Sequence, residues 1–155
     1  MLSINLNYFS IKFNELGLHP NLLKAIKEKN YIHPTEIQKK AIPILIKKND
    51  VLGSAQTGTG KTAAFALPII HHLINEKKIK HRIKALVITP TRELAIQIDE
   101  NFTSYTKYTN IKNTVIFGGV KQGSQTNSLK NGIDVLIATP GRLLDLMNQG
   151  FISLK

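Results

Sequence analysis

The sequence predicts an α/β domain built on an open parallel sheet with helices on both faces, and three features of the 155-residue chain support this fold class. Short apolar runs without polar alternation, typical of strands buried on both faces, alternate with segments of helical periodicity. A glycine-rich phosphate-binding motif stands between the first of these runs and an apolar helical segment. Each unusual motif follows an apolar run, as ligand-binding motifs do in open α/β sheets. Strands that alternate with helices predict right-handed crossovers and a parallel sheet.

Four apolar runs are expected to form the strands, and they cover residues 51–54, 85–89, 114–117 and 134–139. Helical patterns lie around and between them, over residues 20–29, 35–48 and 61–75 and in the spacing of Leu94, Ile98, Phe102 and Tyr105. Pro43 lies inside the second of these helices, where it lacks an N–H and clashes with the preceding turn. We therefore expect a kink or a break at Pro43.

The composition excludes some classes of protein and favours others. The chain has no cysteine, which excludes disulfides and thiolate metal sites, and no apolar run approaches the roughly 18 residues of a membrane span. The amino terminus lacks a secretory signal pattern, so we expect a cytoplasmic protein. A net charge of +11 favours a polyanionic partner, although 18 of the 21 basic residues are lysine, a bias that an AT-rich genome also produces.

A phosphate-binding loop is the most specific single motif. Gly53 opens a G-x-x-x-x-G-K-[ST] pattern, and the residues expected to bind nucleotide phosphates are Ala55, Gln56, Thr57, Gly58, Thr59, Gly60, Lys61 and Thr62. Two of these are catalytic candidates, because Lys61 is expected to reach the β- and γ-phosphates and the Thr62 hydroxyl to ligate Mg²⁺ through the nucleotide. A flexible Gly/Thr linker is the alternative, but linkers do not separate two apolar runs with Lys-Thr at a helix start.

Gln38 and Phe13 each have two interpretations. Thr35 and Gln38 fit a capping box, in which the Gln38 side chain reaches back to the Thr35 N–H. A glutamine amide also matches the N6/N7 edge of adenine, because it carries both a donor and an acceptor. Phe13 stacks on a base or belongs to the core, and the residues alone favour the core.

Two Thr-Pro-x-Arg turns indicate a phosphate-rich partner. Arg92 and Arg142 stand in these turns at helix starts, and a guanidinium grips phosphate bidentately where lysine offers a point charge. The alternative is that each arginine caps a turn or pairs with a nearby carboxylate, Glu93 or Asp145. The paired glycines Gly118 and Gly119 are either a tight turn or a place where a nucleic-acid backbone approaches closely.

No metal site is expected from protein side chains alone. The five histidines show no spacing typical of metal ligands. A phosphate-loop ATPase also needs a carboxylate at the carboxyl end of a buried strand, to hold Mg²⁺ and activate water. Asp50 and Asp134 precede their strands, and Glu93 and Asp145 lie in helical segments. The chain is therefore expected to contain half of an active site.

Taken together, these motifs resemble the DEAD-box ATP-dependent RNA helicases in order and approximate spacing, over nearly the whole chain from about residue 8. The runs 117–120 and 138–146 look most like the bacterial RhlE-type subgroup. The resemblance implies a RecA-like P-loop NTPase fold and ATP as the nucleotide, with Phe13 and Gln38 matching the family's adenine-recognising Q motif. It also implies sequence-independent binding of the RNA backbone by Pro90, Thr91, Arg92, Glu93, Gly118, Gly119, Thr139, Pro140, Gly141 and Arg142.

The chain departs from the family pattern at its carboxyl end. Family members continue into an Asp-Glu-Ala-Asp strand, a Ser-Ala-Thr motif and a second RecA-like domain, and none of these can be placed on this sequence. We therefore expect a helical Q-motif region at residues 1–49 and an incomplete RecA-like domain at 50–155. A sheet that lacks an inner strand is expected to be marginally stable and prone to association.

Two functions are compatible with these observations. The first is an ATP- and RNA-binding segment of a helicase that remodels RNA duplexes, with very slow hydrolysis or none by this chain alone. The second is a non-enzymatic nucleotide- or RNA-binding module, or an interaction module that pairs its open sheet edge with another chain.

Overall fold

A parallel three-stranded sheet forms the centre of the molecule. The computed structural model describes residues 11–76 and 83–154, and its strands are β1 (Ala85–Ile88), β2 (Asn113–Ile116) and β3 (Val135–Ala138). Their order is β1-β3-β2, with Ala85 and Asn113 both in register with Val135. Each strand lies within one residue of its predicted bounds at either end, and the α/β fold class is confirmed.

The central strand β3 explains why its sequence shows no polar alternation. All four of its side chains are fully buried. Val135 and Ile137 enter the core on one face of the sheet, and Leu136 and Ala138 enter the core on the other. Both faces of the sheet therefore need helices to cover them.

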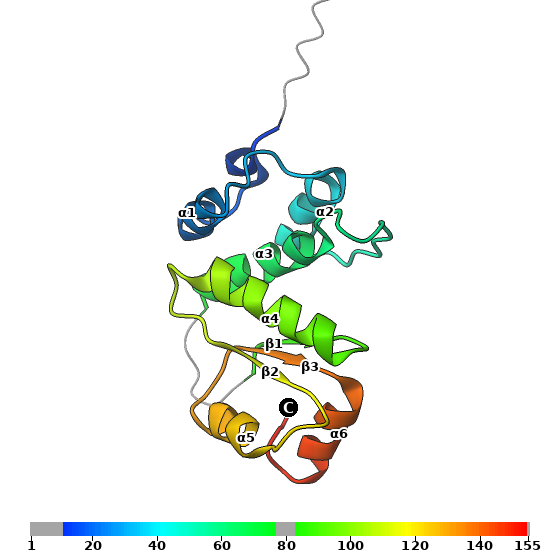
Figure 1. Ribbon diagram of the computed structural model, residues 1–155. Helices are drawn as coiled ribbons and strands as arrows, with labels where there is room; N and C mark the ends of the chain where they lie inside the picture. The colour runs from blue at the N-terminus through cyan, green and yellow to red at the C-terminus, as the bar shows by residue number, and fades with distance from the viewer. Residues whose placement is uncertain (1–10, 77–82, 155) are drawn as a thin grey trace, which may run out of the picture.

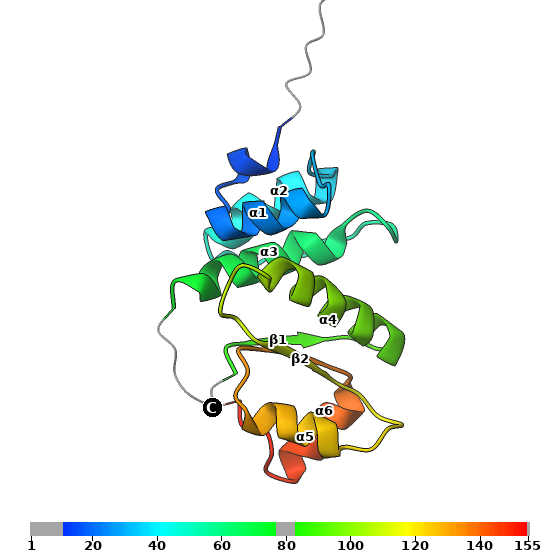
Figure 2. The same cartoon turned by 60° about the vertical axis from the view of Figure 1, so that its left-hand side comes forward.

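In the described part of the chain, six α-helices lie in layers on the two sides of the sheet (Figures 1 and 2). One face carries α4 (Arg92–Thr106), on which α3 (Lys61–Ile74) packs, followed outward by α1 (Pro20–Glu28) and α2 (Glu36–Ile46). The other face carries α5 (Gly123–Lys130) and α6 (Pro140–Asn148), and a short 3₁₀ turn, η1 (Phe13–Leu16), precedes α1. Within the described ranges, every helix is too short or too polar to cross a membrane.

The strand predicted at residues 51–54 is not formed. This segment has no regular structure, and the Leu52 side chain is fully exposed. Ala85 and Thr89 direct their N–H groups toward β3, so alternate residues of β1 face the opposite edge. In the described part of the chain no strand pairs with that edge, and residues 51–54 do not pair with it either. Residues 51–54 therefore have no hydrogen-bonded neighbour, and a strand without one is not stable in water.

One helical prediction also needs correction, and one helix was missed. Pro43 does not break α2, which continues through it to Ile46, because Ala41 and Ile42 are buried and hold the helix against its neighbours. The helix α5 was not predicted. Its polar sequence has no apolar periodicity, and two of its three buried side chains are Gln125 and Thr126.

Candidate functional site

The phosphate-binding motif forms a tight loop that ends at the first residue of α3. Gly58 and Gly60 adopt left-handed φ angles of 84° and 85°, which glycine tolerates without strain. The Thr59 hydroxyl donates to the Gln56 carbonyl at 2.7 Å, and Lys61 Nζ donates to the carbonyls of Ala55 and Gln56. The loop and the following helix therefore have the predicted form, although residues 51–54 just before the loop do not form a strand.

Gln38 joins the start of α2 to this loop. Its Oε1 accepts from the Thr35 N–H at 3.0 Å, which confirms the predicted capping box, and its Nε2 donates to the Gly60 carbonyl at 3.0 Å. The side chain is only 3% exposed. An amide has two donors and two acceptor lone pairs, so one N–H and one lone pair of Gln38 remain after these two bonds.

A cavity of about 700 Å³ opens beside the loop. Its lining includes Gln38, Gly60, Lys61 and Thr62 from the predicted nucleotide site. Ligand pockets in proteins typically measure about 300–1,000 Å³, so this volume is suitable for a nucleotide. Residues from η1, α2, α3 and α4 all reach the cavity, so it is formed by tertiary packing and not by the loop alone.

The aromatic wall of this cavity is Tyr31, a residue that the sequence reasoning missed. Tyr31 is 37% exposed and stacks against Phe13, with ring centroids 6.4 Å apart and an interplanar angle of 24°. Phe13 is only 4% exposed and belongs to the core cluster, as its core interpretation predicts. The available signal was an aromatic residue just before the His33-Pro34-Thr35 entry to α2.

The turns that follow β1, β2 and β3 meet at one rim of the sheet (Figure 1). The Arg92 guanidinium lies over the Phe117 ring at 5.0 Å from its centroid. Arg142 Nη2 donates to the Val120 carbonyl at 3.2 Å. Parallel strands direct their carboxyl ends to the same edge, and these two contacts join both Thr-Pro-x-Arg turns to the Gly118-Gly119 turn.

The two arginines are placed differently. Arg92 is exposed, whereas the side chain of Arg142 is only 11% exposed and its Nε lies 3.5 Å from Asp145 Oδ2. The carboxylate pairing considered for Arg142 is therefore present. Gly118, Gly119 and Gly141 have no atom within 4 Å of the position that a Cβ would take, so the backbone at these turns is open to approach.

The nucleotide loop lies on the same side of the molecule as these turns (Figure 1). Lys61 begins α3, and Arg92 begins α4, the next helix of the same face. Lys61 and Leu94 line a shared apolar hollow, so the first turns of the two helices border the same space. The predicted ATP residues and the predicted RNA residues are thus brought to one side of the molecule.

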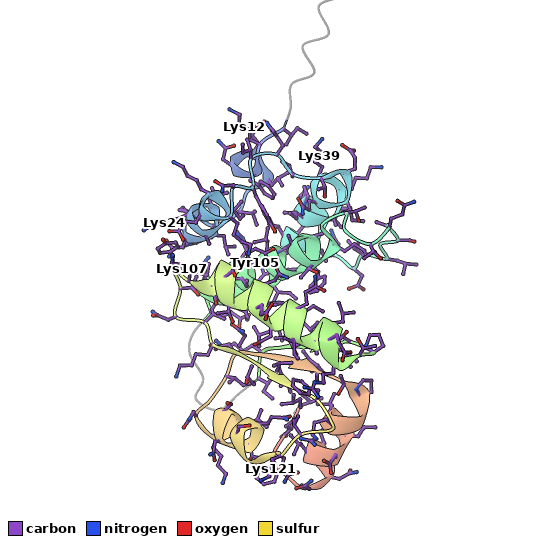
Figure 3. The ribbon with its side chains drawn as sticks, viewed as in Figure 1. Lys12, Lys24, Lys39, Tyr105, Lys107 and Lys121 are labelled. Atoms are coloured by element: carbon purple, nitrogen blue, oxygen red, sulfur yellow. The ribbon has the colours of Figure 1, made fainter. Side chains whose placement is uncertain are left out.

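Positive charge is not confined to this rim. In Figure 3, Lys12, Lys24 and Lys39 lie on or beside the outer helices, Lys107 lies at the end of α4 next to α1, and Lys121 lies in the segment before α5. These five cations are therefore spread over the layers and do not gather at one site. In residues 11–76 and 83–154, no group of histidine and carboxylate side chains is arranged to hold a metal ion.

Comparison with known proteins identifies the family. Residues 35–155 match the family model described as DEAD/DEAH box helicase. The chain belongs to this family. It is 49% identical over 138 residues to the DEAD-box ATP-dependent RNA helicase RhpA of Helicobacter pylori, covering 89% of this chain and 27% of that protein. The ATP-dependent RNA helicase CshA of Limosilactobacillus reuteri is 46% identical, over 93% of this chain and 28% of its own length.

A solved structure of the family has the same fold. The crystal structure of a DEAD box protein from Methanococcus jannaschii aligns with a TM-score of 0.83 and 42% identity, over 92% of this chain and 38% of that one. The DEAD-box chain described here therefore corresponds to the N-terminal part of a first RecA-like domain, and it spans less than a third of the two helicases named above. The RhlE-type subgroup remains a prediction.

Proposed function

We propose that this chain binds ATP in the cavity beside the phosphate loop and RNA along the rim formed by the turns after β1, β2 and β3, as part of an ATP-dependent RNA helicase. One observation carries the proposal: the first turn of α3, at Lys61 of the phosphate loop, and the first turn of α4, which Arg92 begins, border one hollow. This arrangement supports a nucleotide site and a backbone-binding rim that act on each other.

The nucleotide site recognises two ends of ATP. The loop N–H groups, the start of α3 and Lys61 Nζ bind the phosphates, because a helix N-terminus and a nearby cation both favour anions. Gln38 lies against the loop, and its remaining N–H and lone pair match the N7 and N6 atoms of adenine. The exposed ring of Tyr31 supplies a face for the base to stack on.

The residues present also fit Mg²⁺ bound through the nucleotide. Thr62 is partly exposed and lines the cavity next to Lys61, and a hydroxyl oxygen is a ligand that a hard cation accepts. When bound, Mg²⁺ neutralises charge on the β- and γ-phosphates. Thr62 would hold that ion.

The rim binds RNA without reading its sequence. Arg92 and the turn backbones at Gly118, Gly119 and Gly141 are open to a sugar–phosphate backbone. Phosphate contacts position a strand but carry no base information. Binding of this kind weakens steeply with salt, because neutralised phosphates release their counterions.

Hydrolysis by this chain alone is expected to be slow or absent. Among the described residues that line the cavity there is no aspartate or glutamate, so no carboxylate is placed to activate water. The same observation favours a second candidate function, in which the chain is a nucleotide- and RNA-binding module that does not hydrolyse ATP.

Calorimetric titration of ATP and anisotropy titration of single-stranded RNA at two salt concentrations test the proposal. We expect K61A to weaken ATP binding at least about tenfold, the loss of roughly one charge-assisted bond, while RNA binding persists. We expect R92A to weaken RNA binding while ATP binding persists. Robust RNA-stimulated hydrolysis would contradict the carboxylate argument, and salt-insensitive RNA binding would contradict the backbone rim.

A further inference from the structure

The turn between β2 and α5 is held by one buried side chain. Gln125, in the first part of α5, is 7% exposed. Its Oε1 accepts from the Phe117 N–H at 3.1 Å, and its Nε2 donates to the Phe117 carbonyl at 3.2 Å. One amide thus satisfies both backbone groups of Phe117, as a neighbouring strand would.

This pair of bonds begins where the sheet stops. The Thr139 N–H donates to the Ile116 carbonyl at 3.1 Å, which is the last bond between the ends of β2 and β3. The next residues lead into Gly118 and Gly119, which are exposed and have no atom within 4 Å of a Cβ position. The Gln125 amide therefore fixes the point from which this open turn leaves the sheet.

Both arginine turns contact the segment that Gln125 holds. Arg92 lies over the Phe117 ring, and Arg142 donates to the Val120 carbonyl. The position of the 117–120 turn therefore sets where these two guanidinium groups lie relative to each other. Gln125 itself is buried beneath the turn and is not available to a ligand.

We propose that Gln125 is a positioning residue for RNA binding, because its amide holds the 117–120 turn and, through it, the spacing of Arg92 and Arg142. This inference rests on the proposed RNA-binding function of the rim. Gln125 itself is not expected to contact RNA. A purely structural role, in which Gln125 only stabilises α5, predicts the same loss of stability on substitution but no selective loss of RNA affinity.

The substitution Q125E separates these two roles through pH. A protonated glutamic acid has the donor and acceptor of an amide, so its carbonyl oxygen accepts the Phe117 N–H and its O–H donates to the Phe117 carbonyl. The ionised carboxylate still accepts the Phe117 N–H, but its second oxygen is negatively charged and repels the Phe117 carbonyl oxygen. We expect burial to raise the pKa of this carboxyl group toward the pH range of the measurement.

The experiment measures the dissociation constant of a fluorescent oligouridine for Q125E and for the unchanged chain from pH 5 to pH 8. We expect the ratio of the two constants to be near 1 at the acidic end and to rise by about tenfold at pH 8, the effect of one unmade buried hydrogen bond. ATP affinity is expected to stay the same in both proteins, since Gln125 lies outside the nucleotide cavity.

Two further variants keep the test decisive. Q125M has a similar length without polar atoms and is expected to weaken RNA binding by a similar factor at every pH. T126V is the matched control, because Thr126 is equally buried in α5 and its hydroxyl donates only within that helix, to the Gly123 carbonyl at 3.0 Å. We expect T126V to lower the melting temperature and leave RNA affinity unchanged.

The outcomes are distinguishable. A Q125E ratio that does not change with pH, or RNA and ATP affinities that fall together, would overturn this inference and leave the proposed function in place. An equal loss of RNA affinity in T126V and Q125M would also overturn it, in favour of a structural role. If the unchanged chain binds no oligouridine, the proposed function fails and this inference fails with it.

Discussion

The side-chain amide of Gln38 lies directly against the backbone of Gly60, with Nε2 3.0 Å from the Gly60 carbonyl oxygen. A Cβ added to Gly60 would stand 2.3 Å from the same nitrogen. Gly60 also has a φ angle of 85°, in the left-handed region. Gly60 therefore has to lack a side chain for two reasons. The turn of the phosphate loop requires the left-handed φ angle, and the Gln38 side chain of the α2 capping box occupies the space that a Cβ would need.

The first prediction compares G60A with G58A. Gly58 has nearly the same φ angle, 84°, but open space around it. G58A is expected to cost about 1–2 kcal/mol of the free energy of unfolding, the strain of a left-handed alanine. G60A is expected to cost at least about 1 kcal/mol more, because the methyl group displaces Gln38 from its bonds. Urea unfolding of both variants measures the difference.

A double variant provides the control. Q38A removes the amide that the new methyl group meets, so the costs of G60A and Q38A should combine to less than their sum. Equal costs for G58A and G60A would show that Gln38 does not constrain the loop.

The sequence predicted the elements with the clearest periodicity, and it failed where tertiary partners decide the structure. The buried β3 and the capped α2 were predictable from apolar runs and from the Thr35–Gln38 spacing. Residues 51–54 have the composition of a strand, but a strand forms only with a neighbour beside it. The polar α5 gave no signal, because the burial of Gln125 depends on the turn that it holds and not on hydrophobicity.

In the candidate site, too, the local motifs were predictable and the tertiary contacts were not. The phosphate loop and the arginine turns are local motifs, so their residues could be named in advance. Tyr31 could not, because its exposed face is defined by its stacking on Phe13 and by the cavity that α2, α3 and α4 enclose. Arg142 was named as a phosphate ligand, but its burial against Val120 and Asp145 is a consequence of tertiary packing.

The second prediction concerns the aromatic wall. Y31A is expected to weaken ATP binding by about 5- to 150-fold, since stacking of a base on an aromatic ring contributes roughly 1–3 kcal/mol. Y31F keeps the ring and is expected to bind ATP normally. Y108A is the control, because Tyr108 lies away from the cavity and contacts Glu28 and Lys24. Calorimetric titration measures all three, and equal losses in Y31A and Y108A would exclude a specific role for Tyr31.

The third prediction separates the two arginines. R92A is expected to leave the melting temperature unchanged, to weaken RNA binding and to reduce the slope of its salt dependence by about one, the value for one lost phosphate contact. R142A is expected to destabilise the fold by about 1 kcal/mol, because it removes a side chain that is only 11% exposed together with its hydrogen bond to the Val120 carbonyl. Thermal melts and RNA titrations over a salt series test both expectations. A stable R142A protein would show that Arg142 has no structural role.

The fourth prediction is a loss of stability in mild acid. The His19 N–H donates to His71 Nδ1 at 3.1 Å, and the Asn21 N–H donates to His19 Nδ1 at 3.2 Å. Burial lowers the pKa of His71 below its ordinary value, and repulsion from His72 and His19 adds to the effect. The folded protein therefore binds this proton less readily than the unfolded chain, so stability is greatest above about pH 6.5 and falls as the pH drops below it.

The variant H71N tests this assignment, because the asparagine oxygen can accept the His19 N–H but does not titrate. Between pH 7.5 and pH 5.5, the melting temperature of the unchanged chain is expected to fall further than that of H71N. Parallel decreases in the two proteins would place the acid sensitivity elsewhere.

The fifth prediction follows from the open edge of β1. In the described residues no strand pairs with this edge, Ile88 is 58% exposed, and Leu52 is fully exposed. Unpaired N–H and C=O groups beside apolar side chains form a template for another strand, so the chain is expected to associate as its concentration rises. Sedimentation velocity over a concentration series measures this directly.

Two lysine substitutions locate the surface responsible. I88K places a charge on β1 itself, where Ile88 is 58% exposed, and is expected to reduce association, because a partner strand could not pair there without burying the lysine. L144K is the matched control. Leu144 is also 58% exposed, and it lies on α6, which covers the face of the sheet opposite to α4. Equal effects of the two substitutions would indicate that net charge, and not the β1 edge, governs association. A dilute and a concentrated sample that both sediment as monomers would contradict the prediction altogether.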